Sequence, residues 1–497
     1  MDNSSNFKIF LQNLKNRKSQ LVWSKIVADM ETPITASFKL KSQKAPFFLL
    51  ESVEGGSAKG RYSIIGVKPD IIWQCDESKA KLMDLNTNKT TTSSNIFASF
   101  RKLLERTRLE IPNGLPPMAA GLIGYMSYDA IRFIEPSVPD SNPDVIGIPV
   151  GLFMRPTIML IFDSVNHSLY VCTPVWETKG DAQKLYREAK ARINKVKDKL
   201  RKTYVSEYQA KNFGKKNLAF NSTHTPEDYY NMVEKAKEYI LAGDIFQVVP
   251  SQRMKAKFDI SAFAFYRSLR HLNPSPFLFY LNFGDFQLVG SSPEILVRLR
   301  DNKVTIRPLA GTRKRGKNPT EDEALARELL ADTKEISEHL MLIDLSRNDV
   351  GKVAKPGTVK VTEKMIIEYY SHVMHISSNV EGELASGYDA LDALFAGLPV
   401  GTVSGAPKIR AMQIIDELEN EKRSFYAGCV GYFSANGSMD TCITLRTGLV
   451  KDGTLYIQAG GGIVAESDPV AEYQESCNKA KALQVAAERS IRFINPK

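Results

Sequence analysis

The chain has 497 residues, 43% hydrophobic and 25% charged, a balance that indicates a folded globular protein of roughly two or three domains and argues against disorder. The net charge of +10 is modest, and the dispersed lysines and arginines disfavour nucleic-acid binding while suiting a small anionic substrate. Five scattered cysteines without zinc or Cys-x-x-Cys spacing, no signal-peptide core and no membrane-length apolar run predict a cytoplasmic protein with reduced thiols.

Residues 1–205 form the first predicted region, of mixed helices and strands. Its elements, in chain order, are strands at 46–53 and 71–75, an amphipathic helix at 96–108, strands at 156–163 and 168–175, and a strongly charged helix at 181–202. Residues 206–223 are polar and aperiodic, and we predict that they are a connector.

Residues 224–497 form the second predicted region, which is denser in regular structure. A threonine cap and a helical period predict a helix at 225–244, and the segments 246–258, 277–308 and 428–464 predict antiparallel strands joined by Asn-Gly and Asp-Gly turns. Because strands and helices do not alternate one for one, we expect an α+β fold of layered antiparallel sheets flanked by helices.

Two pairs of glutamates stand at the same spacing on two predicted helices. Glu472 and Glu475 follow the helix cap Asp468, and three-residue spacing puts both on one face, where like charges repel. The alternative is a solvated face, because Lys479 can pair with Glu475.

The second pair lies in "DTKEISEHLMLIDLSRND". Glu335 can be explained as the third residue of a capping box begun by Asp332, but Glu338 has Met341 and Leu342 one turn later and no local cation. Two helices that each present a Glu-x-x-Glu face predict a site for a hard divalent cation, Mg²⁺, shared with an anionic substrate.

Many blocks of the second region, in order, resemble the chorismate-utilising enzymes. These blocks are "GSSPEILV", "RPLAGTRKRG", "KEISEHLMLIDLSRNDVGKV", "HVMHISSNVEGEL", "PVGTVSGAPKIRAMQIIDELE", "AGCVGYF" and "QAGGGIVAESDPVAEYQESCNKA". The resemblance spans about residues 225–491. In the first region "LLES" and "GRYSIIG", together with "NPSPFLFYL" of the second, resemble the regulatory tryptophan pocket of anthranilate synthase component I.

The resemblance implies a fold of two intertwined subdomains and a role for each matching residue. It implies that Glu338 and Glu475 bind Mg²⁺, with Glu335 and Glu472 supporting them, and that Glu294 is the general acid for the departing C4 hydroxyl of chorismate. It assigns His375 to the later loss of pyruvate and Thr402 to the catalytic group. The implied substrate contacts are Gly311, Thr312, Tyr426, Arg446, Gly460, Gly461, Gly462 and Lys479.

Three of these assignments have a structural alternative when the residues are taken alone. A glycine run is more often a bulge or turn, a single histidine among apolar residues is more often a core residue, and Arg446 could be a strand-edge ion pair. The chemistry also fits binding: glycines 460–462 can bring backbone N–H groups to a carboxylate, and arginine grips a carboxylate with two hydrogen bonds.

Two positions separate the reactions of the resembled enzymes. Members that use water have a lysine where this chain has Gln247, and aminodeoxychorismate synthases typically have one where it has Ala310. Without either lysine, the resemblance implies conversion of chorismate and ammonia to anthranilate and pyruvate, the first step of tryptophan biosynthesis. Because some aminodeoxychorismate synthases lack that lysine, aminodeoxychorismate synthase component I of the folate pathway is the alternative. A chorismate binder without activity is a third, less favoured interpretation.

The ammonia source and the regulation complete the expectation. Cys429 has no histidine in a glutaminase context and is predicted to pack in the core, so the resemblance implies a separate glutamine amidotransferase subunit, component II, in a heterotetramer of two plus two. It also implies feedback inhibition by L-tryptophan. The implied tryptophan contacts are Glu51, Ser52, Asn273, Pro276, Phe277 and Leu278.

Overall fold

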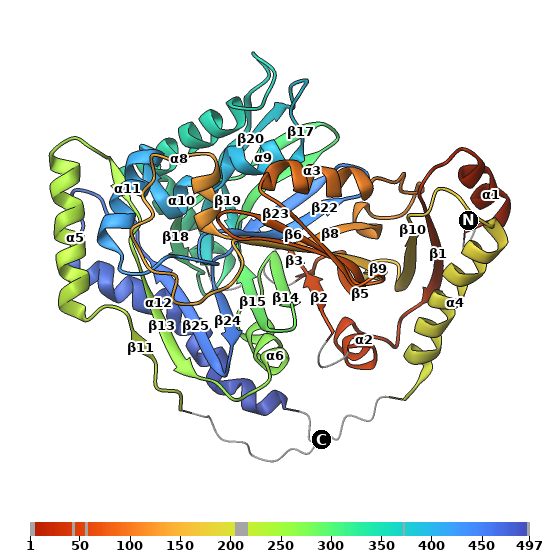
Figure 1. Ribbon diagram of the computed structural model, residues 1–497. Helices are drawn as coiled ribbons and strands as arrows, with labels where there is room; N and C mark the ends of the chain where they lie inside the picture. Colours follow the sequence, from red (N-terminus) through yellow and green to blue (C-terminus); the bar gives the residue numbers. More distant parts are fainter. Residues whose placement is uncertain (1–4, 42–44, 55–57, 204–216, 371–372, 495–497) are drawn as a thin grey trace.

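The protein is seen as a computed structural model that describes residues 5–41, 45–54, 58–203, 217–370 and 373–494. One large antiparallel sheet organises it, with helices outside (Figure 1). Its first arm runs in the order β11 (Asn221–Ser222), β13 (Ser251–Lys257), β25 (Thr454–Gly460), β24 (Thr447–Lys451), β15 (Phe286–Ser292), β14 (Phe277–Asn282) and β2 (Phe47–Glu51).

From β2 the sheet turns into a second arm through the N-terminal strands. This arm runs through β5 (Tyr62–Cys75), β9 (Gly151–Asp163), β8 (Gly121–Met126), β22 (Cys429–Ser434), β23 (Met439–Ile443), β16 (Ile295–Arg300), β17 (Lys303–Ile306) and β20 (Val373–Glu383). Strands β18 (Leu309–Lys314) and β19 (Lys360–Tyr369) both pair with β20.

Side branches extend the sheet at its N-terminal strands. They are β10 (Ser168–Val175) and β1 (Gln20–Val27) beyond β9, and β6 (Ala80–Asp84) and β7 (Lys89–Ser93) beyond β5. Two small ladders are separate: β12 (Gln247–Val248) with β21 (Gly405–Ala406), and β3 (Val53–Glu54) with β4 (Ala58–Lys59).

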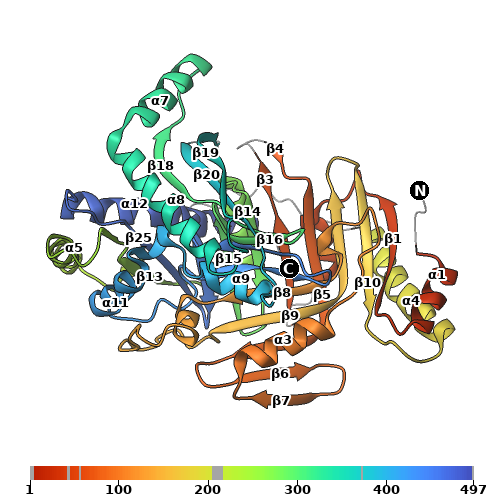
Figure 2. The ribbon, with the colours of Figure 1, turned by 90° about the horizontal axis from the view of Figure 1, so that it is seen from above.

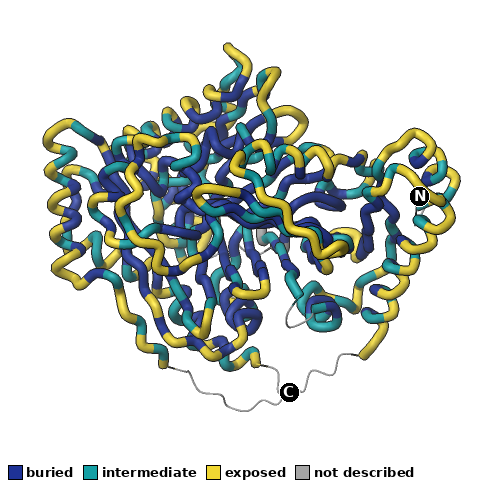
Figure 3. The backbone as a smooth tube through the Cα atoms, in the orientation of Figure 1, coloured by how far each residue is buried: buried dark blue, intermediate teal, exposed yellow. Residues whose placement is uncertain are grey.

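The two arms pack against each other across a buried apolar core. Phe279, Leu288 and Leu449 of the first arm share one cluster with Val430 and Cys442 of the second, all of them at most 2% exposed. The buried residues are concentrated where the arms and their covering helices meet (Figure 3). Sheets about 10 Å apart bury the alternate side chains of both inner faces, so the apolar alternation along these strands determines which face is inside.

Helices cover the outer faces. The first arm is covered by α6 (Ala262–Leu272) and α12 (Pro469–Arg489), with α5 (Pro226–Leu241) packed on α12. The second arm is covered by α7 (Pro319–Ala331), α8 (Thr333–Gly351) and α9 (Ala390–Gly397), whereas α10 (Gly401–Ser404) and α11 (Lys408–Leu418) contact the small ladder of β12 and β21. The N-terminal strands carry α1 (Phe7–Lys15), α2 (Pro33–Leu40), α3 (Ile96–Arg106) and α4 (Ala182–Arg201). Short 3₁₀ turns are η1 (Pro117–Ala119), η2 (Tyr128–Phe133) and η3 (Ser490–Phe493). Seen from above, α7 projects from the body near β18 (Figure 2).

The α+β fold class predicted from the sequence is confirmed, and most predicted elements lie within a few residues of their observed bounds. The predicted domain division stays a prediction, but the two regions share sheet pairs, because β2 pairs with β14 and β8 with β22. Part of the predicted connector, 204–216, lies outside the described residues. Among the helices of the described residues, none combines the length and the apolar composition that a membrane span requires.

Candidate active site

Glu294 lies in the short link that connects β15 of the first arm to β16 of the second arm. Its side chain is buried, and the Thr402 hydroxyl of α10 lies 3.3 Å from both carboxyl oxygens. Burial raises the pKa of Glu294 to about 8, and the hydrogen bonds from Thr402 and from the Leu309 backbone act more weakly in the opposite direction. The carboxyl group therefore carries a proton at neutral pH and can donate it.

His375 lies on β20 beside the bulge of β18. Its Nδ1 is 3.0 Å from the Gly311 carbonyl oxygen and 3.0 Å from the Thr312 hydroxyl. Because a carbonyl only accepts, Nδ1 carries the hydrogen and Nε2 is left with a lone pair. Burial lowers the pKa of His375, so the ring is neutral and Nε2 can accept a proton. Gly311 has φ +64°, a left-handed conformation that favours glycine at this bulge.

The other predicted substrate contacts come from several elements: Tyr426 precedes β22, Arg446 precedes β24, glycines 460–462 end and follow β25, and Lys479 lies on α12. Arg446 is close enough to His375 to lower its pKa, and no ion pair or hydrogen bond of its guanidinium is found in the part of the chain that the structure describes. Tyr426 receives a hydrogen bond from the Gly460 N–H, and the Lys479 ammonium donates to the Gly460 carbonyl at 3.0 Å. A guanidinium without a partner among the described residues is suited to gripping a carboxylate.

The α8 glutamates are half-buried and each has a polar partner. Gln247 Nε2 donates to Glu338 Oε1 at 3.1 Å, and Arg313 lies 3.4 Å from Glu335. Burial and the neighbouring Glu338 charge raise the pKa of Glu335. The capping-box prediction is wrong in one respect: Asp332 does cap α8, but the Glu335 side chain points to Arg313 instead of returning to the cap. Arg313 of β18 thus supplies a cation for Glu335, whereas the partner of Glu338 is the neutral amide of Gln247.

The α12 glutamates differ from each other. Asp468 caps the helix as predicted, and Glu472 is half-buried, accepting from Ser467 Oγ at 2.7 Å. Burial, followed by the neighbouring Glu475, raises the pKa of Glu472. Glu475 is 54% exposed and pairs with Lys479 at 2.8 Å, as the solvated-face alternative expected.

Close approaches of the glycine run link the two helices. A Cβ added to Gly461 would lie 2.9 Å from Glu472 Oε2, and one added to Gly462 would lie 2.6 Å from Gln247 Nε2, which in turn binds Glu338. Gly461 and Gly462 therefore lie between Glu472 of one Glu-x-x-Glu pair and Gln247, which binds Glu338 of the other pair. Within the described ranges no three acidic, histidine or cysteine side chains converge closely enough to hold an ion as they stand, and Gln247, Arg313 and Lys479 are bound to the carboxylates of Glu338, Glu335 and Glu475.

The predicted tryptophan contacts line a cavity of about 770 Å³ that extends to Glu294. Ser52, Pro276, Phe277 and Leu278 all border it. Asn273 ends α6 nearby, and its buried Nδ2 has no hydrogen-bond partner among the residues that the structure covers.

Glu51 borders the same cavity but already has partners. Its carboxylate accepts from Arg270 Nε at 2.7 Å and from the Tyr266 hydroxyl at 2.6 Å. Neither Arg270 nor Tyr266 was predicted from the sequence, although their four-residue spacing on α6, just before "NPSPFLFYL", places them on one helix face.

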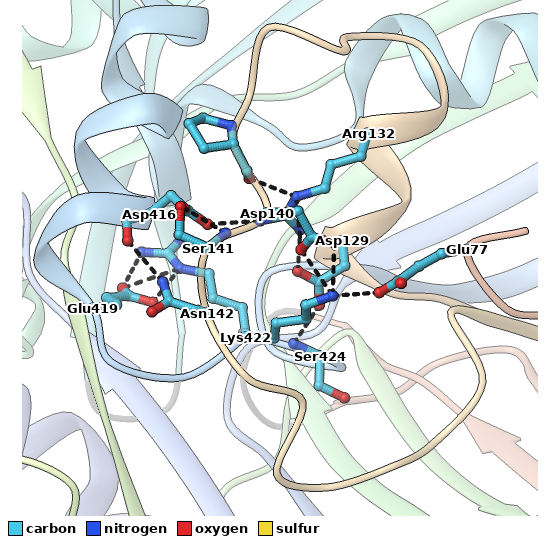
Figure 4. Close-up of polar contacts among 12 residues, drawn as sticks. Glu77, Asp129, Arg132, Asp140, Ser141, Asn142, Asp416, Glu419, Lys422 and Ser424 are labelled. Atoms are coloured by element: carbon cyan, nitrogen blue, oxygen red, sulfur yellow. Dashed lines mark hydrogen bonds and ion pairs between the residues drawn. The ribbon is translucent and has the colours of Figure 1, made fainter.

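A polar network joins the N-terminal region to the end of α11 and the segment that follows it. This network was not predicted from the sequence. Arg132 of η2 pairs with Asp129 at 2.6 Å and with Asp416 of α11 at 2.8 Å, beside Glu419 (Figure 4).

Cys429, on β22, is 1% exposed, and burial raises the pKa of its thiol to about 12, which fits the predicted core role.

Comparison with known proteins agrees with this architecture. Residues 46–485 match the family model of chorismate binding enzymes. Anthranilate synthase component 1 of Cereibacter sphaeroides is 53% identical over 97% of both chains, and that of Aquifex aeolicus is 43% identical over 94% of both.

Solved structures show the same fold. The crystal structure of anthranilate synthase component I from Streptococcus pneumoniae superposes with a TM-score of 0.75 at 36% identity, covering 92% of this chain and 99% of that one. The menaquinone-specific isochorismate synthase of Escherichia coli shares the fold at 20% identity, with a TM-score of 0.69 over 97% of this chain and 98% of that one. Since the family model and the relatives span most of its length, the chain belongs to the chorismate-binding enzyme family, in the anthranilate synthase component 1 group.

Proposed function

We propose that the protein is an anthranilate synthase component 1, which converts chorismate and ammonia to anthranilate and pyruvate. The observation that carries this proposal is the buried, protonated Glu294 facing Thr402. Loss of the C4 hydroxyl requires a proton donor that is still protonated near neutral pH, and Glu294 is such a donor.

The chain's own residues account for two half-reactions. Ammonia adds at C2 while the C4 hydroxyl leaves as water, taking its proton from Glu294, which Thr402 holds in place. Arg446 and Tyr426 hold the enolpyruvyl carboxylate, and Lys479 and the glycines 460–462 hold the ring carboxylate. In the second half the ring loses a proton and pyruvate, and the neutral His375, with Nε2 free, serves that step.

We assign a Mg²⁺ ion to the two Glu-x-x-Glu pairs. Glu338 and Glu475 would hold it, with Glu335 and Glu472 supporting them directly or through water, and carboxylate oxygens are the donors that Mg²⁺ prefers. The raised pKa values of Glu335 and Glu472 fit this role, because a bound dication would relieve the repulsion that contributes to them. When bound, the ion would neutralise the substrate's ring carboxylate and draw electrons from the ring.

Two residues favour ammonia over other nucleophiles. Gln247 lies beside Glu338, and its amide cannot accept a proton to activate water. Ala310, on β18 next to Gly311, offers no amine to attack the ring.

The ammonia source and the regulation belong to the same proposal. A glutamine amidotransferase subunit supplies ammonia in a complex of two plus two chains, and L-tryptophan inhibits by binding in the cavity bordered by Ser52 and Leu278. Because Arg270 and Tyr266 already bind Glu51, the tryptophan ammonium group would join an existing network there.

The deciding experiment is to incubate the purified chain with chorismate, Mg²⁺ and an ammonium salt and to identify the product by mass. Anthranilate with pyruvate supports the proposal. Aminodeoxychorismate would establish the alternative activity, and isochorismate would show that water enters the site despite Gln247.

A further inference from the structure

Arg423 and Glu419 form an ion pair that is almost completely buried behind the candidate active site. Arg423 follows α11 in the turn before β22, and its side chain is 1% exposed, that of Glu419 4%. Arg423 Nη2 lies 2.6 Å from Glu419 Oε1, and its Nε donates to both carboxylate oxygens at 3.1 and 3.0 Å. A pair so deeply buried needs further hydrogen bonds to offset desolvation.

Arg423 finds those further bonds on two segments that carry site residues. Its Nη1 donates to the Val403 carbonyl at 2.8 Å, and its Nη2 to the Val249 carbonyl at 2.5 Å. Val403 is the neighbour of Thr402 in α10, and Val249 directly follows β12, which begins with Gln247.

Glu419 binds a third such segment. Its Oε1 accepts from the Ser251 backbone N–H at 2.8 Å and from the Ser251 hydroxyl at 2.7 Å. Ser251 is the cross-strand partner of Gly460. The Ser251 hydroxyl also accepts a hydrogen bond, at 2.8 Å, from Nε2 of Gln458 on β25. Glu419 therefore fixes the end of β25 from which the glycine run emerges.

We propose that the Arg423–Glu419 ion pair is a positioning device for the chorismate site, which holds the segments of Thr402, Gln247 and Gly460 in one geometry without touching the substrate. The guanidinium also lies 5.6 Å from the ring of Tyr426, which is itself an assigned substrate contact. The proposal rests on the proposed function, because the positioned residues are those assigned to chorismate.

The N-terminal region supports this device from outside. The Tyr128 ring lies 4.8 Å from the Arg423 guanidinium, and Asp129 accepts from the Ser424 backbone N–H at 2.7 Å (Figure 4). Ser424 has φ +56°, a conformation that costs free energy in a residue other than glycine, and the bond from Asp129 helps to hold it. The turn that carries Arg423 is thus fixed on both sides.

The test compares Arg423→Lys with a matched control, Arg155→Lys. Lysine keeps the charge beside Glu419, but its point-like ammonium cannot replace a planar fork that reaches Glu419, Val403 and Val249 together. Arg155 makes the same kind of fork to Asp70, at 2.9 and 2.8 Å with both side chains 7% exposed, but between β9 and β5.

We expect Arg423→Lys to raise KM for chorismate and to lower kcat, with a loss of about 10- to 100-fold in kcat/KM, since small misplacements of reacting groups cost that much. Arg155→Lys should leave both constants unchanged although it loses comparable thermal stability. A merely structural role would lower the folded fraction but not change KM. Unchanged constants in Arg423→Lys, or equal losses in both variants, would overturn the proposal.

Two further measurements keep the outcome decisive. If Arg423→Lys does not fold, Ser251→Ala removes only the hydroxyl link to Glu419 and should raise KM in the same direction; an unchanged KM counts against the device. Amide hydrogen exchange needs no turnover, so it separates this proposal from the proposed function. Faster exchange in 248–251, 401–405 and 459–463 is expected in Arg423→Lys but not in Arg155→Lys, even if the wild type does not convert chorismate. Unchanged exchange would contradict the device.

Discussion

At the scale of single residues, the protonation of Glu294 limits the proposed reaction. Its pKa of about 8 means that the acid form is present below that pH and lost above it. The Thr402 hydrogen bond lowers this pKa, so Thr402→Val should raise it further. We therefore expect kcat/KM, divided by the concentration of unprotonated ammonia, to fall above about pH 8 in the wild type. In Thr402→Val the value is lower throughout, and its fall is moved to higher pH.

The measurement is the pH profile of anthranilate formation with ammonium salts for the wild type, Thr402→Val and a control, Thr157→Val. Thr157 is on β9, where its hydroxyl donates to the Lys68 carbonyl, so the control removes one hydroxyl hydrogen bond elsewhere. A descending limb that stays in place, or moves to lower pH, in Thr402→Val would contradict the assigned hydrogen bond.

Glu338 provides a test of the metal assignment. Glu338→Gln keeps an amide oxygen that can accept from Gln247 but removes one carboxylate charge, so we expect turnover to be abolished. The melting temperature without Mg²⁺ should be unchanged or slightly higher, because repulsion with Glu335 is relieved. The control is Asp344→Asn, farther along α8, whose carboxylate pairs with Arg347 at the surface. Full activity of Glu338→Gln at saturating Mg²⁺ would show that the assignment is wrong.

The sequence could predict which residue types are needed but not their environments. The general-acid role that the resemblance implied for Glu294 requires a raised pKa, and burial in the structure supplies the cause. The partners of Glu335, Glu338 and Glu51 could not be predicted, because Arg313, Gln247 and Arg270 are distant in sequence and reach them only through the fold.

At the scale of elements, local signals were sufficient where one segment determines its own structure. The Asp468 cap and the proline after it start α12, and apolar period 3.6 gives α3 and α4 close to their predicted bounds. On α8 the apolar residue Leu340 is 45% exposed, because only one face of the helix packs on β20. Exposure of this kind depends on which face a neighbour covers, and no local pattern contains that information.

The pairing of β2 with β14 is the element that makes the tryptophan pocket testable. Glu51 is opposite Leu278 in this pair, and Ser52 follows at the edge of the cavity. Gly60 lies so close to Ser52 that a Cβ added to Gly60 would come within 2.5 Å of the Ser52 side chain, and Ser52 borders the cavity, so we expect the ring of Ser52→Phe to enter the cavity. We expect this variant to make anthranilate but to ignore tryptophan.

The measurement is anthranilate synthesis in a tryptophan titration. Thr91→Phe, on the exposed strand β7, is the control and should remain inhibited. Inhibition of Ser52→Phe equal to that of the wild type would place the regulatory site elsewhere, and a wild type indifferent to millimolar tryptophan would remove the pocket assignment.

At the scale of the whole molecule, the sequence predicted layered antiparallel sheets but not their order. Alternating apolar residues define a strand and its buried face, whereas the choice of partner strand depends on contacts over hundreds of residues. The strands β8 and β22, for example, pair although one begins at Gly121 and the other at Cys429. The resemblance to a known family implied two intertwined subdomains, which periodicity could not, but it did not give this pairing.

The last prediction concerns the division of labour between this chain and a partner. The chain contains the proposed chorismate site, but its one cysteine in a suggestive motif, Cys429, lies on a strand paired on both sides by β8 and β23, with a thiol pKa of about 12. Such a thiol is protonated and inaccessible, so it cannot attack glutamine. Alone, the chain should therefore use ammonium salts and not glutamine.

With ammonium salts the rate should rise with pH as more ammonia becomes unprotonated, until the loss of the Glu294 proton opposes the increase. Adding a component 2 chain should allow glutamine use near neutral pH, because ammonia released within a complex can reach bound chorismate before it is protonated in bulk water. The measurement is anthranilate formation from glutamine with and without that chain, with Cys429→Ala as the control. The variant should behave like the wild type in both assays. Glutamine-dependent synthesis by the highly purified single chain, lost in Cys429→Ala, would show instead that the nucleophile is in this protein.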